Sequence, residues 1–327
     1  MAHSDTPIDN YRSTAGARAV QDRYRELLAC WPVPNQQRTL PTRAGPTFVV
    51  SSGPQDAPPV LALQGSAANT ARWLPQIVPW ARHLRVHAVD VIGEPGFSSP
   101  ARPPLNSDAH AEWLDDVMLG LGLTHASLIG VSRSGWIVTD YASRRPQRVT
   151  SLVLLAPGGI GRAKVAIVLR SLLLHPFGAW GRRRLLSAVV GAPVPVTTAG
   201  GAARPDPTGW QAQLPALTML IFQHFRPARQ ILPLFTDDSL RRLTMPVLAV
   251  VGGRDVIFDS RHTAKRLART ASQATIRFLP TARHVLPDQT TEVLNFLLTS
   301  NEDPSANPRT SNSALNKNTL ERVPPSP

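Results

Sequence analysis

The stretch "ASLIGVSRSGWIVTDYA", residues 126–142, decides the fold of this chain. It begins as a short apolar run of the kind that forms a buried strand, and it ends with the residue spacing of a helix. Gly130 and Ser132 lie where the one changes into the other. A strand that turns sharply into a helix at a serine pushes the hydroxyl out above the end of a sheet. We therefore expect an α/β fold with Ser132 at the carboxyl edge of its sheet.

Six more apolar runs have strand character, and amphipathic stretches separate several of them. The runs are residues 47–52, 59–65, 85–91, 150–157, 246–253 and 274–280. Several are apolar at successive positions, which is typical of strands buried on both faces of a parallel sheet. The stretch 107–121 has the apolar spacing of a helix with one buried face. This alternation predicts a mostly parallel, doubly wound sheet that is covered by helices on both sides.

The alternation stops between Pro157 and Met245, where helical patterns surround a loop rich in Pro, Gly and Thr. We expect residues 159–244 to form a helical cap that is inserted into an α/β core of residues 15–158 and 245–300. Residues 1–14 are expected to be a flexible N-terminus. Residues 301–327 are rich in Asn, Ser, Pro and Thr, and a segment with so few apolar groups is expected to be disordered.

The net charge of +13 first suggests an anionic partner such as nucleic acid, but the pattern of basic residues argues against it. Only three of the 35 basic residues are lysines, and the arginines are scattered along the chain without interleaved aromatic residues. The single cysteine, Cys30, fits a reducing compartment, and we find neither a secretory signal nor an apolar stretch long enough to cross a membrane. We therefore expect a cytoplasmic protein whose partner is a small molecule, with no nucleic acid and no membrane. Oligomeric state is not predicted.

Three residues that could form a serine nucleophile and its proton relay follow predicted strands. Ser132 ends one strand, Asp255 follows "PVLAVVGGR", and His284 lies in "ARHVL" after the last strand. In an open α/β sheet such strand ends meet at one edge, where ligands bind. A serine hydroxyl is a poor nucleophile unless an imidazole removes its proton, and a carboxylate orients that imidazole. Asp259 is the alternative candidate for the acid.

A tetrahedral oxyanion needs two backbone N–H donors. One is expected from Arg133, the residue after the nucleophile, and the other from the loop after "PVLALQG", with Ser66 as the donor. Backbone donors tolerate unusual side chains, so the arginine at position 133 does not by itself disable such a site.

The ordered set of motifs "LALQGSAANTARWLP", "VDVIGEPGFSSP", "LIGVSRSGW", "PVLAVVGGRDVIFD" and "ARHVL" resembles the α/β-hydrolase superfamily. More narrowly, with its "WPVP" segment at residues 31–34, the chain is similar to small bacterial carboxylesterases of the naproxen-esterase type. The resemblance spans about residues 15–299. It implies that no cofactor and no metal take part and that the substrate is a small, mainly apolar acyl compound. It also implies that cap residues line an apolar tunnel; our candidates are Trp210, Met219, Phe222 and Phe225, for each of which packing within the cap is an equal alternative.

Three residues depart from the family pattern. Gln64 stands where the family has histidine, Ser134 replaces the second glycine of the G-x-S-x-G turn, and Arg133 replaces a smaller side chain. Arg133 could pair with an anionic group of the substrate or with Glu94 of the protein. Gln64 and Arg133 are therefore also candidate substrate-binding residues.

These observations predict a serine hydrolase that cleaves a carboxylic ester, lactone or thioester through an acyl-enzyme. The departures keep a second hypothesis open, a biosynthetic enzyme on the same scaffold (a cyclase, C–C bond lyase or acyltransferase) with little general esterase activity. A third hypothesis is a binding protein that retains the fold without the chemistry. An aspartate would stand at position 132 in a dehalogenase or an epoxide hydrolase, and Ser132 argues against both.

Overall fold

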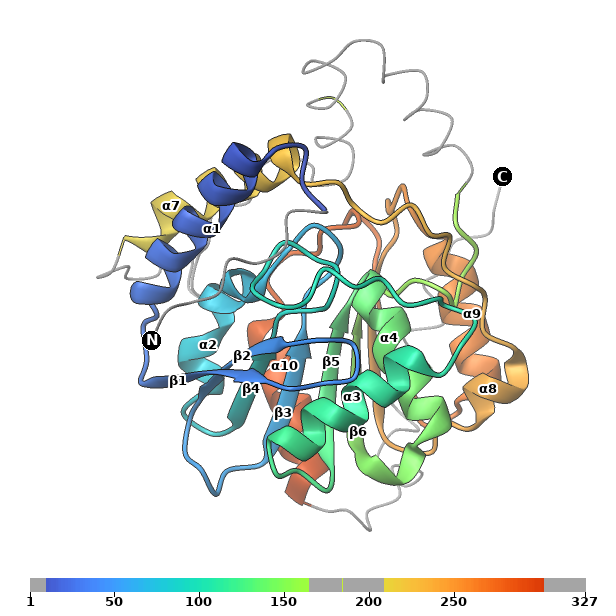
Figure 1. The fold of residues 1–327 in the computed structure, drawn as a ribbon. Coiled ribbons are helices and arrows are strands. Elements are labelled where there is room, and N and C mark those ends of the chain that lie inside the picture. The colour runs from blue at the N-terminus through green and yellow to red at the C-terminus, as the bar shows by residue number, and fades with distance from the viewer. Residues whose placement is uncertain (1–9, 165–183, 185–208, 303–327) are drawn as a thin grey trace.

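A computed structural model describes residues 10–164, 184 and 209–302 of the chain. Its centre is an eight-stranded sheet in the order β1-β2-β4-β3-β5-β6-β7-β8 (Figure 1). The strands are β1 (Asn35–Leu40), β2 (Thr47–Ser52), β3 (Pro59–Leu63), β4 (Arg85–Val89), β5 (Ala126–Val131), β6 (Val149–Leu155), β7 (Val247–Gly252) and β8 (Ala274–Leu279). The order reverses direction at β3, so the loops after β3 and β5 meet at the same end of the sheet.

The predicted α/β fold with a mostly parallel sheet is confirmed. Strands β3 to β8 run parallel to one another, whereas β2 runs antiparallel to both β1 and β4. Strands β2 to β8 correspond to the seven predicted runs, whereas β1 was not predicted. Its sequence, NQQRTL, is polar and exposed at five of six positions, so it carries neither an apolar run nor an alternating pattern.

Helices cover both faces of the sheet and enclose two separate apolar cores. The α-helices are α1 (Thr14–Ala29), α2 (Leu74–Trp80), α3 (Ala109–Gly120), α4 (Arg133–Arg144), α7 (Trp210–His224), α8 (Asp237–Arg241), α9 (Ser260–Thr270) and α10 (Thr290–Glu302). Two short 3-10 helices are η1 (Thr70–Trp73) and η2 (Pro146–Arg148). Residues of α3, α4, α8 and α9 contribute to one core, and residues of α1, α2, α7 and α10 to the other. None of the helices within the described ranges is long and apolar enough to cross a membrane.

Helix α7, in the segment expected to form a cap, lies beside the N-terminal helix α1 (Figure 1). The chain just before α1 joins this contact, because Tyr11 pairs with Phe225 in an isolated bridge and their rings meet edge to face. Asn10 is buried and donates hydrogen bonds to the carbonyls of Gly93 and Pro100. Residues 10–13 of the predicted flexible N-terminus are therefore anchored. Residues 1–9, most of the predicted cap before residue 209, and residues 303–327 lie outside the described residues.

Candidate active site

Ser132 lies in a strained turn between β5 and α4, at the carboxyl edge of the sheet. Its φ of 53° and ψ of −112° fall in a region that residues with a Cβ rarely occupy. Two backbone hydrogen bonds hold it there: the Ser132 N–H donates to the Leu155 carbonyl at 2.9 Å, and the Gly158 N–H donates to the Ser132 carbonyl at 3.0 Å. Since α4 begins at the next residue, the turn presents the hydroxyl above the sheet, as the sequence predicted.

Two glycines allow the strand and helix to approach closely at this turn. A Cβ at Gly130 would come within 2.5 Å of the Ser134 carbonyl oxygen, and one at Gly135 within 2.9 Å of the Pro157 Cα. Ser134, at the position of the motif's second glycine, is buried and its hydroxyl donates to the carbonyl of Gln64. The departure at Ser134 is thus accommodated by a hydrogen bond, and Gly135 makes the close contact one residue later.

The structure brings Ser132, His284 and Asp255 together in one chain of hydrogen bonds. His284 Nε2 lies 2.9 Å from Ser132 Oγ, and His284 Nδ1 lies 2.8 Å from Asp255 Oδ2. The other carboxylate oxygen of Asp255 accepts from the N–H groups of Ile257, at 2.7 Å, and Phe258, at 3.1 Å. Because those bonds fix the carboxylate, it can orient one tautomer of the imidazole, with the free electron pair facing the serine.

Asp259, the alternative acid, has a different place in the structure. It is the N-cap residue of α9, and its side chain accepts from the His262 N–H at 3.0 Å. Such caps satisfy an N–H of the first helical turn that has no partner within the helix. Asp255, which is 2% exposed and follows β7, is the carboxylate that contacts His284.

The segment after β3, residues 64–67, lies against the serine turn. A Cβ at Gly65 would be 3.3 Å from the Ser132 Cβ, so a side chain there would narrow the space beside the nucleophile. The two predicted oxyanion donors flank this point, since Ser66 follows Gly65 and Arg133 follows Ser132. Neither N–H is hydrogen-bonded to any residue in the part of the chain that the structure describes. We name residues 64–67 the oxyanion segment.

Glu94 contacts the oxyanion segment directly, a role that the sequence did not reveal. Its Oε2 accepts from the Ala67 N–H at 2.6 Å, and its two oxygens lie 3.3 and 3.4 Å from the Ser66 hydroxyl, which donates to them. Burial raises the pKa of Glu94 to about 7, although the Ala67 N–H and the charge of Arg133 oppose that shift. The sequence indicated Glu94 only as a partner for Arg133, because its contact with residue 67 depends on how two loops pack.

Arg133 lies between Glu94 and Gln230. Its Nε is 3.9 Å from Glu94 Oε1, and its Nη2 donates to Gln230 Oε1 at 2.8 Å. The side chain is only 11% exposed, and burial lowers its pKa while the charge of Glu94 raises it. Burial, followed by the charge of Arg133, also lowers the pKa of His110 to about 4. Of the two predicted partners for Arg133, the structure places Glu94 beside it.

The remaining predicted substrate-binding residues lie in different surroundings. Trp210 and Phe225, at the two ends of α7, are 3% and 1% exposed and belong to the core that includes α1. Packing is therefore the role that the structure provides for both. Met219 and Phe222 are half-buried, and their contact with a substrate stays a prediction. Gln64 is buried at the start of the oxyanion segment, where its carbonyl accepts from Ser134.

Comparison with known proteins agrees with this fold. Residues 58–189 match the family described as alpha/beta hydrolase fold. Carboxylesterase YbfK of Bacillus subtilis is 26% identical over 282 residues, which cover 83% of this chain and 89% of that protein. The uncharacterized carboxylesterase nap of the same organism is 29% identical over 277 residues, covering 80% of this chain and 85% of that protein.

Solved structures extend the similarity to three dimensions. The crystal structure of naproxen esterase from Bacillus subtilis aligns with 88% of this chain and 99% of its own, at a TM-score of 0.70 and 25% identity. Carboxylesterase CesB (YbfK) from the same organism aligns with 88% of this chain and 98% of its own, at a TM-score of 0.71 and 25% identity. The chain therefore has the α/β-hydrolase fold, and it resembles the bacterial carboxylesterases in sequence and structure.

Proposed function

We propose that this protein is a serine hydrolase that cleaves a carboxylic ester, lactone or thioester through an acyl-enzyme. The observation that carries the proposal is the chain of hydrogen bonds from Ser132 through His284 to Asp255. It begins at a serine in a strained turn beside two N–H groups that have no hydrogen-bond partner among the described residues, which is the arrangement that acyl transfer requires. The carboxylesterases among its relatives support the same reaction class.

Each residue has one role in the proposed reaction. Ser132 Oγ attacks the substrate carbonyl carbon while its proton passes to His284 Nε2. The Ser66 and Arg133 N–H groups stabilise the oxyanion that forms, and Asp255 stabilises the imidazolium. As the tetrahedral intermediate collapses, His284 returns the proton to the leaving alcohol or thiol, and the acyl group remains on Ser132. Water, deprotonated by His284, then releases the carboxylic acid and regenerates the serine.

The test is the intact mass of the protein after exposure to a fluorophosphonate, compared with that of Ser132→Ala. The probe transfers its phosphonyl group to an activated serine hydroxyl and needs no knowledge of the substrate. We expect one adduct on the natural protein and none on the variant. In a panel of short nitrophenyl esters and lactones, we expect Ser132→Ala to lower kcat by about 10⁴-fold or more.

Two other outcomes would point elsewhere. An absence of labelling on the natural protein would contradict an activated serine and favour a binding function. Labelling of Ser132 without turnover of esters or lactones would favour the biosynthetic alternative, in which the activated serine serves a reaction other than general hydrolysis. Met219 and Phe222 are our candidates for contact with an apolar acyl group, and their replacement by alanine should raise KM more than it lowers kcat.

A further inference from the structure

Two side chains link the first turn of α4 to the oxyanion segment, Ser134 directly and Arg133 through Glu94, and both residues depart from the family pattern. The hydroxyl of Ser134 donates to the carbonyl of Gln64, where the segment begins. Arg133 lies beside Glu94, whose carboxylate accepts from the Ser66 hydroxyl and the Ala67 N–H, where the segment ends. The helix that follows the nucleophile is therefore linked to both ends of the oxyanion segment, directly at Gln64 and through Glu94 at Ser66 and Ala67.

Burial makes these contacts specific. The Glu94 side chain is 3% exposed and Ser134 is 1% exposed, so neither can exchange its protein partner for water. A buried carboxylate is costly unless hydrogen bonds and an opposite charge compensate it. Here the compensation comes from the two segments that supply the oxyanion donors, and removal of either polar group would leave its partners unsatisfied.

The backbone of Ala67 shows what the Glu94 contact maintains. Its φ of 57° is in the left-handed region, which an alanine avoids because its Cβ approaches the following carbonyl oxygen. The N–H of this strained residue donates to Glu94 Oε2 at 2.6 Å. Without that acceptor the backbone could relax, and the N–H of the adjacent Ser66 would turn with it.

We infer that Glu94 and Ser134 are positioning residues that hold the Ser66 N–H in place beside Ser132. The inference rests on the proposed function, since a displaced N–H matters only if an oxyanion forms there. Neither side chain needs to touch the substrate; both act through the oxyanion segment. A donor that is fixed before the reaction costs no reorganisation when negative charge develops, so loosening the segment should lower kcat and leave KM nearly unchanged.

Glu94 is surrounded by charged and titratable groups from several parts of the fold. Arg133 of α4 and Arg102, in the same loop as Glu94, favour the ionised form of Glu94. Tyr11 faces Glu94 from the N-terminal segment. Protonation of Glu94 removes the attraction to Arg133. The advantage of the natural protein over Glu94→Gln in kcat should therefore shrink as the pH falls through about 7.

The experiment compares Glu94→Gln, Ser134→Ala and Ser134→Gly with the natural protein. It measures kcat and KM on a nitrophenyl ester, with active sites counted by fluorophosphonate so that only folded, reactive protein contributes. We expect kcat to fall about tenfold or more in Glu94→Gln, below the effect of removing an oxyanion donor itself, with KM within about twofold. Ser134→Gly is the most informative variant, because it restores the family glycine yet removes the hydrogen bond to Gln64. Its kcat should fall as much as that of Ser134→Ala.

Matched controls come from the other end of the same helix. Asp140→Asn removes a buried carboxylate charge that is paired with Arg144, and Ser143→Ala removes a buried hydroxyl that donates to a backbone carbonyl. Both controls should retain the natural kcat.

The outcomes separate this inference from the proposed function. A natural protein that is not labelled would overturn the proposed function, and the inference with it. A natural protein that is labelled and active, with unchanged kcat in Glu94→Gln and Ser134→Ala or improved kcat in Ser134→Gly, would overturn the inference alone. The inference would also be overturned if kcat declined as much in the two controls as in the Glu94 and Ser134 variants. Such a result would indicate a general disruption of helix α4.

Discussion

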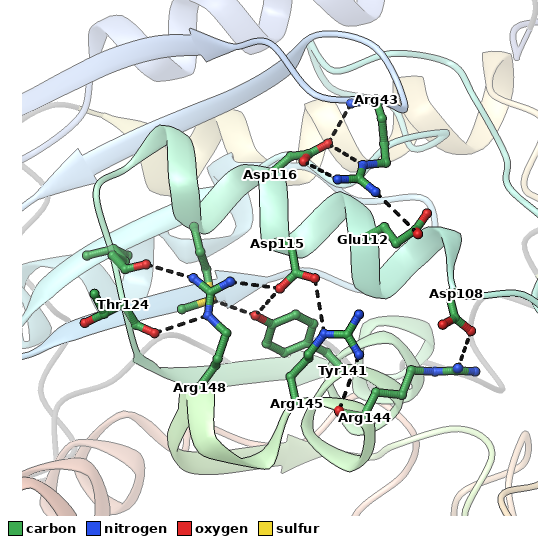
Figure 2. Close-up of polar contacts among 12 residues, drawn as sticks. Arg43, Asp108, Glu112, Asp115, Asp116, Thr124, Tyr141, Arg144, Arg145 and Arg148 are labelled. Atoms are coloured by element: carbon green, nitrogen blue, oxygen red, sulfur yellow. Dashed lines mark hydrogen bonds and ion pairs between the residues drawn. The ribbon is translucent and has the colours of Figure 1, made fainter.

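Helix α4 is bordered by arginine–carboxylate pairs at both ends, and the two ends differ in burial. At the N-terminal end, Arg133 and Glu94 are 11% and 3% exposed and lie next to Ser132. At the C-terminal end, the side chains of Arg144 and Arg145 are each 32% exposed. Arg144 contacts the exposed Asp108 and Arg145 contacts Asp115 (Figure 2), and Arg144 also pairs with the buried Asp140. Exposed pairs are screened by water and salt, whereas a buried pair is retained at a considerable desolvation cost. Arginine–carboxylate pairs therefore attach α4 to the rest of the fold at its C-terminal end. At its N-terminal end, in our proposal, such a pair supports the reaction.

The largest effect is expected at Gly130, in β5 just before the N-terminal end of α4. An alanine Cβ would lie 2.5 Å from the Ser134 carbonyl oxygen and 2.8 Å from the Gly135 nitrogen, so the helix must move. We expect Gly130→Ala to lower the free energy of unfolding by about 3 kcal/mol, as overpacking of a tight contact does. We also expect kcat to fall about 10²-fold because the nucleophile is displaced. Denaturant unfolding and ester kinetics measure the two effects.

Gly122→Ala is the control for this change. Gly122, unlike Gly130, has a positive φ, of 74°, and a Cβ there would meet no atom within 4 Å. The control should lose only the roughly 1 kcal/mol that left-handed backbone costs an alanine, with kcat unchanged. Equal losses in the two variants would contradict the close approach of α4 as the cause of the loss at Gly130.

The buried pair can be probed through the pH dependence of stability. Burial raises the pKa of Glu94 from 4.5 to about 7, so the folded state holds this proton more tightly than the unfolded chain does. Ionisation of Glu94 therefore lowers stability as the pH rises from about 4.5 to about 7, and the loss persists above that range. Because glutamine does not titrate, the unfolding temperature of Glu94→Gln relative to the natural protein should increase across this window.

The size of that change is bounded by the shift in pKa. Each pKa unit corresponds to about 1.4 kcal/mol. Between pH 5 and pH 8, the free energy of unfolding of Glu94→Gln should therefore rise by about 1–3 kcal/mol relative to that of the natural protein. Calorimetry at several pH values measures it, with Asp140→Asn as the comparison. A difference that is constant with pH would contradict titration of Glu94 in this range. If Glu94→Gln has a lower kcat but a higher stability than the natural protein at high pH, then Glu94 is retained for function and not for stability.

The smallest effects are expected at the C-terminal end. Asp115 is 23% exposed and accepts from Tyr141 and Arg148 at 2.9 Å and from Arg145 at 3.3 Å (Figure 2). Asp115→Asn should lower the free energy of unfolding by about 1 kcal/mol or less, because water screens the ion pairs. High salt should diminish the difference further, and kcat should not change. A clear decline in kcat would mean that the two ends of α4 are coupled.

Sequence patterns predicted most of the sheet because burial leaves a simple signature. Strands such as β5 and β7 are apolar at successive positions, and Ser132, Asp255 and His284 all follow strands, so their meeting at one edge could be expected. Helix α1 and strand β1 were not among the predicted elements. In β1 only Leu40 is buried, so its pairing with β2 depends on backbone hydrogen bonds that residue type does not reveal.

The parts of the candidate site that could not be predicted depend on contacts between loops. The Ser134 hydroxyl finds an acceptor only because the carbonyl of Gln64 turns toward α4, and a carbonyl direction has no signature in the sequence. The bond from Ala67 to Glu94 likewise joins residues 27 positions apart through a strained backbone. Motif spacing identifies the reacting groups in our proposal, whereas the groups that hold them require the structure.

The contact between Gly135 and Pro157 bears on how related sequences can be found. The close approach of α4 to the chain after β6 occurs at the third residue after Ser132, and the second residue carries a hydroxyl. A pattern search that demands glycine two positions after the serine would therefore pass over this chain. A pattern that accepts a small hydroxyl residue followed by glycine, with a proline just beyond the next strand, describes the same geometry. Such a pattern could retrieve further chains that share this variant turn.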